Sequence, residues 1–305
     1  MIAPLPESVQ PHFLVIGAGR SGTTSIHSYL SQHPRLFLPP KNPSYFYATD
    51  LTGSRLADHP ALIPPYFVST SSAYARLFAG APCGCLRGEV SPVYLASIRV
   101  ANRIASVLPA VKLIAILRNP IDRVRSRYLS RRRDGLESAA SFEELVSREL
   151  EQPVYRDDAH ATYLAGGMTS HFLATYYEAF PRQNILILFF EDLARDAASL
   201  MAGICRFVGV DDTFTFDVSH IHNQGGGRIR NHTLGRLWAG SQPWRRRLRP
   251  FLPKPWRDQV FQRVNANSEP VPLLGETKRR LLDLYDQDIQ RLQELTGRDL
   301  ASWRC

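Results

Sequence analysis

The sequence has few of the features that mark membrane, disulfide-stabilised or disordered proteins. Its longest apolar run covers residues 185–190, far short of the roughly 18 residues that a membrane-spanning helix needs. Only 4 cysteines occur in 305 residues, too few for a disulfide scaffold. With 44% hydrophobic and 21% charged residues, the composition is globular rather than disordered. We therefore expect a single folded domain over residues 1–305.

Targeting and metal-binding signals are also scarce. Residues 1–11 contain no basic segment before an apolar core, so we expect no secretory signal and a cytoplasmic location with reduced thiols. Cys83 and Cys85 are too close together for the usual zinc-binding pair. We see no metal-ligand cluster and expect no metal.

Positive charge is in excess. The chain has 37 Lys and Arg against 28 Asp and Glu, a formal net charge of +9. Such an excess favours an anionic partner, which leaves nucleic acid, a phosphorylated cofactor, an acidic glycan and a membrane surface open. No zinc finger or RNA-recognition signature is present, so nucleic acid is not expected.

Three apolar runs, at residues 13–16, 112–117 and 184–190, each precede a segment of helical character. This alternation is typical of a parallel sheet with buried strands. Residues 42–92 are rich in Pro, Ser, Tyr and Gly and predict a loop-rich insertion, and residues 219–272 predict a second loop-rich, basic segment. We predict an α/β fold with a central, mostly parallel sheet flanked by helices.

Capping residues indicate where several helices begin and end. Asn119 can cap a helix whose first residue is Pro120, and Ser141 with Glu144 has the spacing of a capping box. The periodic apolar residues of the last helix stop before Gly297, which suits a helix C-terminus.

A glycine-rich turn between the first strand and the first helix is the strongest functional signal. Gly17 and Gly22 have the spacing of a Walker A loop, but Thr23 stands where that loop has its lysine, and the cation is Arg20 instead. Backbone N–H groups in such a turn, together with a helix N-terminus, favour an anion. The missing lysine makes a nucleoside triphosphate a poor ligand. A strand-to-helix turn without a ligand is the alternative.

A second anion site is predicted where the strand at residues 112–117 ends. Arg118 follows this strand, and Ser126 lies about two turns into the next helix. A planar guanidinium and a hydroxyl suit a phosphate. Alternatively, Arg118 pairs with a carboxylate and Ser126 is only exposed.

These segments resemble the sulfotransferases that use 3′-phosphoadenosine 5′-phosphosulfate (PAPS). Arg20-Ser21-Gly22-Thr23-Thr24-Ser25 resembles the family's phosphosulfate loop, and residues 118–128 meet its R-x-P-x-x-R-x-x-S-x-Y pattern. Residues 88–94 are similar to its G-E-x-S-P-x-Y segment, and residues 297–303 to its closing G-R-D-L-x-x-W. The resemblance implies a P-loop-like sulfotransferase fold and these cofactor-binding residues: Arg20, Ser21, Gly22, Thr23, Thr24, Ser25, Arg118, Ser126 and, from a looser match, Arg228.

The resemblance also implies sulfuryl transfer to an acceptor hydroxyl or amine, with Arg20 as a catalytic residue that stabilises charge. The family's glycan-type members carry their base in a K-E-x-x-F-F segment, and here Asn42 replaces that glutamate. Glu89 is our first candidate for the base, with a structural carboxylate as the alternative, and His33 and Asp50 follow. Val90, where some glycan-type members have lysine, weighs against a heparan-type acceptor.

Two basic patches remain. Residues 131–133 are three arginines at a helix end and predict a solvated face. The segment from Trp244 to Trp256 interleaves aromatics with arginines, which suits peripheral contact with an anionic glycolipid surface or acidic polymer, or else a lid. A carbohydrate or glycolipid acceptor is our first expectation and a phenol or other small metabolite the second. A P-loop kinase and a non-catalytic binding module are the rival functions.

Overall fold

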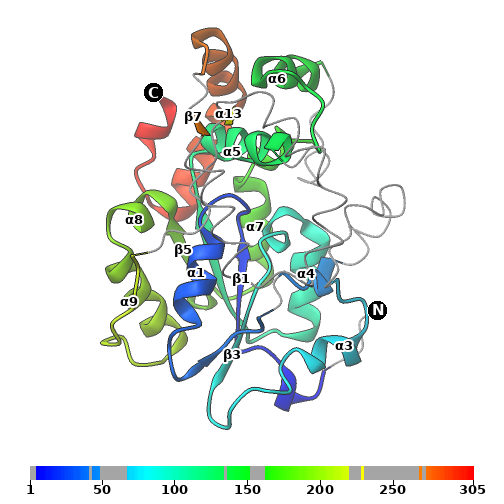
Figure 1. Ribbon diagram of the computed structural model, residues 1–305, viewed down its shortest axis with the longest axis vertical. Coiled ribbons are helices and arrows are strands. Elements are labelled where there is room, and N and C mark those ends of the chain that lie inside the picture. The colour runs from blue at the N-terminus through cyan, green and yellow to red at the C-terminus, as the bar shows by residue number, and fades with distance from the viewer. Residues whose placement is uncertain are drawn as a thin grey trace.

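A five-stranded parallel sheet forms the centre of the protein (Figure 1). The computed structural model describes residues 5–40, 43–48, 67–133, 136–151, 162–219, 228–229, 268–269 and 273–305. The strand order is β2-β3-β1-β4-β5, and every pairing in this sheet is parallel. The strands are β1 (Phe13–Gly17), β2 (Leu36–Phe37), β3 (Leu86–Val90), β4 (Lys112–Leu117) and β5 (Ile185–Phe189).

Helices cover both faces of this sheet (Figure 1). They are α1 (Thr23–Leu30), α3 (Ser71–Arg76), α4 (Ile98–Val107), α5 (Pro120–Arg133), α6 (Phe142–Leu150), α7 (Ser170–Ala179), α8 (Phe190–Arg195), α9 (Ala197–Val208) and α13 (Gly275–Thr296). In the view of Figure 1, α1, α8 and α9 lie on one side of β1, and α4 and α7 lie on the other. Two short strands, β6 (Arg228–Ile229) and β7 (Ser268–Glu269), pair antiparallel. Among the described helices, none is both long and apolar enough to cross a membrane.

The two faces of the sheet have separate apolar cores, because successive side chains of a strand point to opposite faces. In β1, Phe13 and Val15 belong to the core that also contains residues of α1 and α9. Leu14 and Ile16 belong to the other core, with residues of α4, α7 and α13. All four side chains are fully buried, which explains why this strand is apolar on both faces.

The predicted α/β class and three of the strands are confirmed. The apolar runs at residues 13–16, 112–117 and 184–190 correspond to β1, β4 and β5 within one residue at the ends. Asn119 Oδ1 accepts the backbone N–H of Ile121 at 2.9 Å, and α5 begins at Pro120 as predicted. Ser141 Oγ accepts the N–H of Glu144 at 3.0 Å, and Gly297 ends α13 in the left-handed conformation.

The prediction of a loop-rich insertion at residues 42–92 is wrong for part of this span. It contains α3 and, more importantly, β3, which pairs with β1 next to the centre of the sheet. The strand was missed because Arg87, Gly88 and Glu89 interrupt its apolar pattern. Gly88 is opposite Phe13 in the pairing, and a Cβ there would lie 2.0 Å from Phe13 Cζ. The glycine therefore makes room for a core ring.

We predict that Gly88→Ala lowers the free energy of unfolding by about 1–3 kcal/mol, because the added methyl group overpacks against Phe13. Chemical denaturation measures this change, and adding Phe13→Leu should recover part of the loss. Gly203→Ala in α9 is the matched control, since its Cβ meets nothing within 4 Å and the protein should be as stable or more so. An equal loss in both alanine variants would contradict the role of Gly88.

Candidate active site

The glycine-rich turn connects β1 to α1 and leaves polar groups facing inward. Gly22 precedes the first residue of α1 with φ 91°, and a Cβ at this position would lie 2.6 Å from Leu193 Cδ2. Both facts require glycine. Ser21 is fully buried, yet its Oγ has no hydrogen-bond partner. Buried hydroxyls are normally paired, so this atom is available to a ligand in the turn.

The structure brings the two predicted anion sites together. Arg20 Nε donates a hydrogen bond to Ser126 Oγ at 3.2 Å. This bond connects the turn between β1 and α1 to α5, which follows β4. Arg118 Nη1 donates to the backbone carbonyl of Arg20 at 3.1 Å. The Arg118 guanidinium also lies over the ring of Phe190, 4.3 Å from its centroid. Two cations and two hydroxyls, those of Ser21 and Ser126, thus converge on the carboxyl ends of β1 and β4.

Arg118 has unused capacity to bind an anion. Burial lowers the pKa of Arg118 because the guanidinium loses hydration, although Asp122 and Glu191 partly offset this effect. Its Nε is buried without a hydrogen-bond partner. Among the described residues Arg118 forms no ion pair, so the alternative that it pairs with a carboxylate has no support in this part of the chain.

The structure describes some of the other predicted cofactor-binding residues and not others. Thr23 and Ser25 are buried in the first turn of α1, whereas Thr24 is exposed. Arg228 lies in β6, whose backbone is next to α5, but its side chain is outside what the structure describes. Asn42, Asp50 and the segment from Trp244 to Trp256 also lie outside the described residues.

His33 is not placed to act as a base. It follows the far end of α1, so the whole helix separates it from the glycine turn. Both ring nitrogens are engaged: Nδ1 accepts the N–H of Arg35 at 3.1 Å, and Nε2 lies 3.0 Å from the carbonyl oxygen of Asp211.

Glu89 is enclosed by hydroxyl groups. Its Oε1 accepts hydrogen bonds from Ser44 Oγ at 2.5 Å, Ser91 Oγ at 2.5 Å and Tyr94 Oη at 2.8 Å. Its Oε2 accepts one from Tyr74 Oη at 2.5 Å. Burial, and then the charge of Glu89, raise the pKa values of Tyr74 and Tyr94, so both phenols remain donors.

This carboxylate joins several segments and does not line the cavity described next. It links β3 to α3, to residues 43–48 and to the turn that follows β3. That turn supplies Pro92, Val93 and Leu95 to the cavity wall. The geometry therefore supports Glu89 as a positioning residue, and its role as the base stays a prediction.

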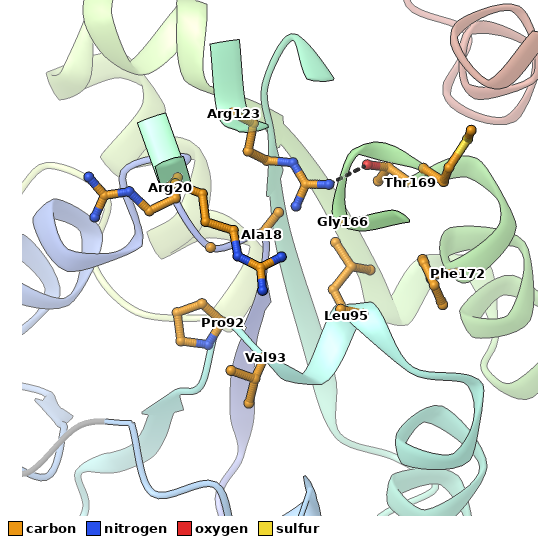
Figure 2. Close-up of a pocket in the computed structure, with 13 residues that line it drawn as sticks. Ala18, Arg20, Pro92, Val93, Leu95, Arg123, Gly166, Thr169 and Phe172 are labelled. Atoms are coloured by element: carbon orange, nitrogen blue, oxygen red, sulfur yellow. Dashed lines mark hydrogen bonds between the residues drawn. The ribbon is translucent and has the colours of Figure 1, made fainter. Parts of the chain in front are cut away.

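A cavity of about 190 Å³ opens beside the glycine turn (Figure 2). Ala18, Gly19 and Arg20 of the glycine turn line part of it. The remaining walls come from the turn after β3, from α5 and from the start of α7: Pro92, Val93, Leu95, Ala96, Arg123, Arg127, Gly166, Met168, Thr169 and Phe172. An apolar cleft with a few arginines at the carboxyl ends of parallel strands is where α/β proteins bind ligands.

Arg123 and Arg127 were not predicted as functional residues. A signal existed, because residues four apart on a helix share one face, and Ser126 already placed that helix at the site. Thr169 carried no comparable signal, since nothing in the sequence shows that the segment before α7 reaches the cavity.

Fold and site together define an α/β protein with arginines and hydroxyls gathered where its parallel strands end. A family model described as "Sulfotransferase family" matches residues 11–214. The chain belongs to the sulfotransferase family, and the predicted fold is confirmed.

Solved and curated relatives agree with this assignment. A crystal structure of a sulfotransferase from Alicyclobacillus acidocaldarius aligns over 97% of this chain and 99% of its own, with a TM-score of 0.71 and 26% identity. Human bifunctional heparan sulfate N-deacetylase/N-sulfotransferase 2 is 29% identical over 205 residues, 66% of this chain. The membrane-associated sulfotransferase kil1 of Dictyostelium discoideum is 29% identical over 121 residues, 39% of this chain. The chain spans only 22% of the length of each of these two curated relatives.

We predict that Glu89→Gln lowers the free energy of unfolding by about 2 kcal/mol, because the amide cannot accept all four hydroxyl donors. Thermal melting measures this, and the pH profile of kcat/KM should keep its shape. Glu178→Gln, an exposed position in α7, is the control and should change neither quantity.

The opposite pattern would establish Glu89 as the base. In that case the Glu89→Gln protein would melt like the wild type, lose about 100-fold or more in kcat, and lose the acidic limb of its pH profile.

Proposed function

We propose that the protein transfers a sulfuryl group from PAPS to a hydroxyl or amine of a carbohydrate acceptor. The observation that carries this proposal is the convergence of Arg20, Arg118 and Ser126 beside a turn that contains an unpaired buried hydroxyl. A cytoplasmic location, a single domain and membrane contact through residues 244–256 stay predictions.

The residues present fit a donor with two separate anionic groups. Ser21, Arg20 and the N–H groups of the turn before α1 would hold the phosphosulfate, since α1 adds the positive end of its dipole there. Arg118 and Ser126 would hold the 3′-phosphate, because the unpartnered Arg118 Nε and the Ser126 hydroxyl leave donors for its oxygens. When bound, PAPS supplies the sulfuryl group and a phosphate leaving group.

Arg20 has the central role in the chemistry. It lies where the glycine turn meets the cavity, so it can reach both the anion in the turn and an acceptor beside it. With PAPS bound, the Arg20 guanidinium would stabilise the negative charge that grows on the leaving phosphate oxygen. The apolar walls from Pro92, Val93 and Leu95 limit the access of water, which would otherwise compete as an acceptor.

The carbohydrate acceptor is supported by the relatives. Several that align with this chain are named for heparan sulfate N-sulfotransferase activity, among them the human proteins 2 and 3. The cavity of about 190 Å³ agrees with one sugar ring in the site, since in other proteins a cavity of about 150 Å³ holds one benzene molecule.

The 3′-phosphate assignment predicts a difference between two nucleotides. 3′,5′-Adenosine bisphosphate should raise the melting temperature more than adenosine 5′-monophosphate does, because only the first reaches Arg118 and Ser126. Arg118→Gln should reduce this preference about tenfold or more, and Ser126→Ala about threefold or more, measured by calorimetric titration.

Arg132→Gln is the control for this titration. It removes one positive charge from an exposed position of the same helix and should leave both affinities unchanged. Equal affinity of the wild-type protein for the two nucleotides would contradict the donor assignment. Magnesium-dependent turnover of ATP would favour a kinase or hydrolase instead.

Label transfer tests the reaction itself. With ³⁵S-labelled PAPS and a panel of methyl glycosides, amino sugars and 4-nitrophenol, label should appear on the sugars. Arg20→Ala should lower the rate about 100-fold or more, because charge on the leaving group loses its partner. Label on 4-nitrophenol alone would contradict the carbohydrate assignment but keep the sulfotransferase activity, whereas no transfer to any acceptor would contradict the activity.

A further inference from the structure

The inner wall of the cavity carries a guanidinium that forms no ion pair among the described residues. Arg123, on α5, is half-buried and lines the cavity with Thr169 (Figure 2). Its Nη2 donates a long hydrogen bond of 3.4 Å to Thr169 Oγ1, and its buried Nε has no hydrogen-bond partner. Burial lowers the pKa of Arg123 to about 10, and the charges of Tyr285 and Asp288 offset this effect only in part.

An acidic group that acts electrostatically on Arg123 is occupied by other donors. Asp288, on α13, attracts Arg123 electrostatically but forms no ion pair with it. Its carboxylate accepts the backbone N–H groups of Thr169 at 2.9 Å and Ser170 at 3.1 Å, and the Ser170 hydroxyl at 2.6 Å. Asp288 therefore holds the start of α7 in place through donors other than Arg123, and Arg123 itself lines the cavity.

The neighbouring arginine differs from Arg123 in this respect. Arg127 Nη1 donates to the carbonyl of Thr162 at 3.1 Å, and its guanidinium lies 5.0 Å from the centroid of the Tyr163 ring. It adds positive potential to the cavity but is already engaged. None of the described residues that line the cavity is acidic, so both charges favour an anionic occupant.

The position of Arg123 identifies which part of a ligand it would meet. The glycine turn, with Arg20, lines one part of the cavity, and Arg123 and Thr169 belong to the walls contributed by α5 and the segment before α7. An acceptor whose reacting group faces Arg20 presents another part of its ring to Arg123. A carboxylate or sulfate on that part would pair with the guanidinium and would also accept the Thr169 hydroxyl.

We propose that Arg123 and Thr169 form a subsite for an anionic group of the acceptor, so that the protein selects an acidic carbohydrate. This proposal rests on the proposed function, because the bound sugar is an acceptor only if the protein transfers a sulfuryl group to it. The binding of the anion to this subsite can be measured without any reaction.

Three sugars of similar shape and different charge test whether an anionic group strengthens binding. Methyl β-D-glucuronide carries a carboxylate, D-glucose 6-sulfate carries a sulfate, and methyl β-D-glucoside is neutral. Each is titrated into the full-length wild-type protein by calorimetry, with and without saturating 3′,5′-adenosine bisphosphate. We expect at least one anionic sugar to bind about tenfold or more tightly than the glucoside, and the stronger of the two identifies the group that is recognised.

Substitutions then assign the preference to residues. Arg123→Gln should remove the preference for the anionic sugar, Arg123→Lys should keep part of it, and Thr169→Val should reduce it about threefold. Arg132→Gln, the exposed control on the same helix, should leave it unchanged. The bisphosphate should bind all four variants as it binds the wild type, which also shows that they are folded.

Two results would overturn the proposal. One is a wild-type protein that binds the neutral glucoside as tightly as both anionic sugars. The other is an Arg123→Gln protein that keeps the full preference for an anionic sugar. Failure of the bisphosphate to bind the wild-type protein would instead contradict the proposed function, while the titrations without nucleotide would still decide whether the subsite exists.

Discussion

Parallel pairing of three adjacent strands is the constraint on which the site depends. β1 lies between β3 and β4, and all three run in the same direction, so their carboxyl ends meet at one edge of the sheet. The glycine turn follows β1, the turn with Ser91 and Pro92 follows β3, and Arg118 follows β4. One backbone arrangement therefore supplies the glycine turn with Arg20, an apolar wall and a second cation.

Polar groups at this edge fall into two kinds. Glu89 has hydroxyl donors on both carboxylate oxygens, and it fixes the wall that follows β3. Arg118, Arg123 and Ser21 keep buried atoms without partners. A satisfied group stabilises the fold, whereas an unsatisfied one costs free energy until something binds. At this edge of the sheet, Glu89 is therefore a group that stabilises the fold, whereas the unpartnered atoms of Arg118, Arg123 and Ser21 are available to a ligand.

The sequence predicted the parts of the fold that are locally apolar and the parts of the site that lie within one motif. β1 is buried throughout, β4 is buried after Lys112, and β5 is buried at its ends and half-buried between them, so all three form apolar runs in the sequence. β3 was not predicted, because its sequence is not apolar throughout. Gly88 leaves space for Phe13 on another strand, and Glu89 accepts hydrogen bonds from distant hydroxyls such as that of Tyr74. The approach of Thr169 to Arg123 depends likewise on how α5 and α7 pack, which no local pattern shows.

The order of the strands also determines when the protein can fold during synthesis. β1 is the first strand of the described sheet to be synthesised, yet its partners are β3 and β4, so Phe13 cannot pair until Gly88 and Lys112 have been made. Pairings between such distant residues slow folding and leave an apolar strand exposed in the meantime. A nascent chain that ends before residue 112 cannot shield both edges of β1, and we expect such chains to need chaperones.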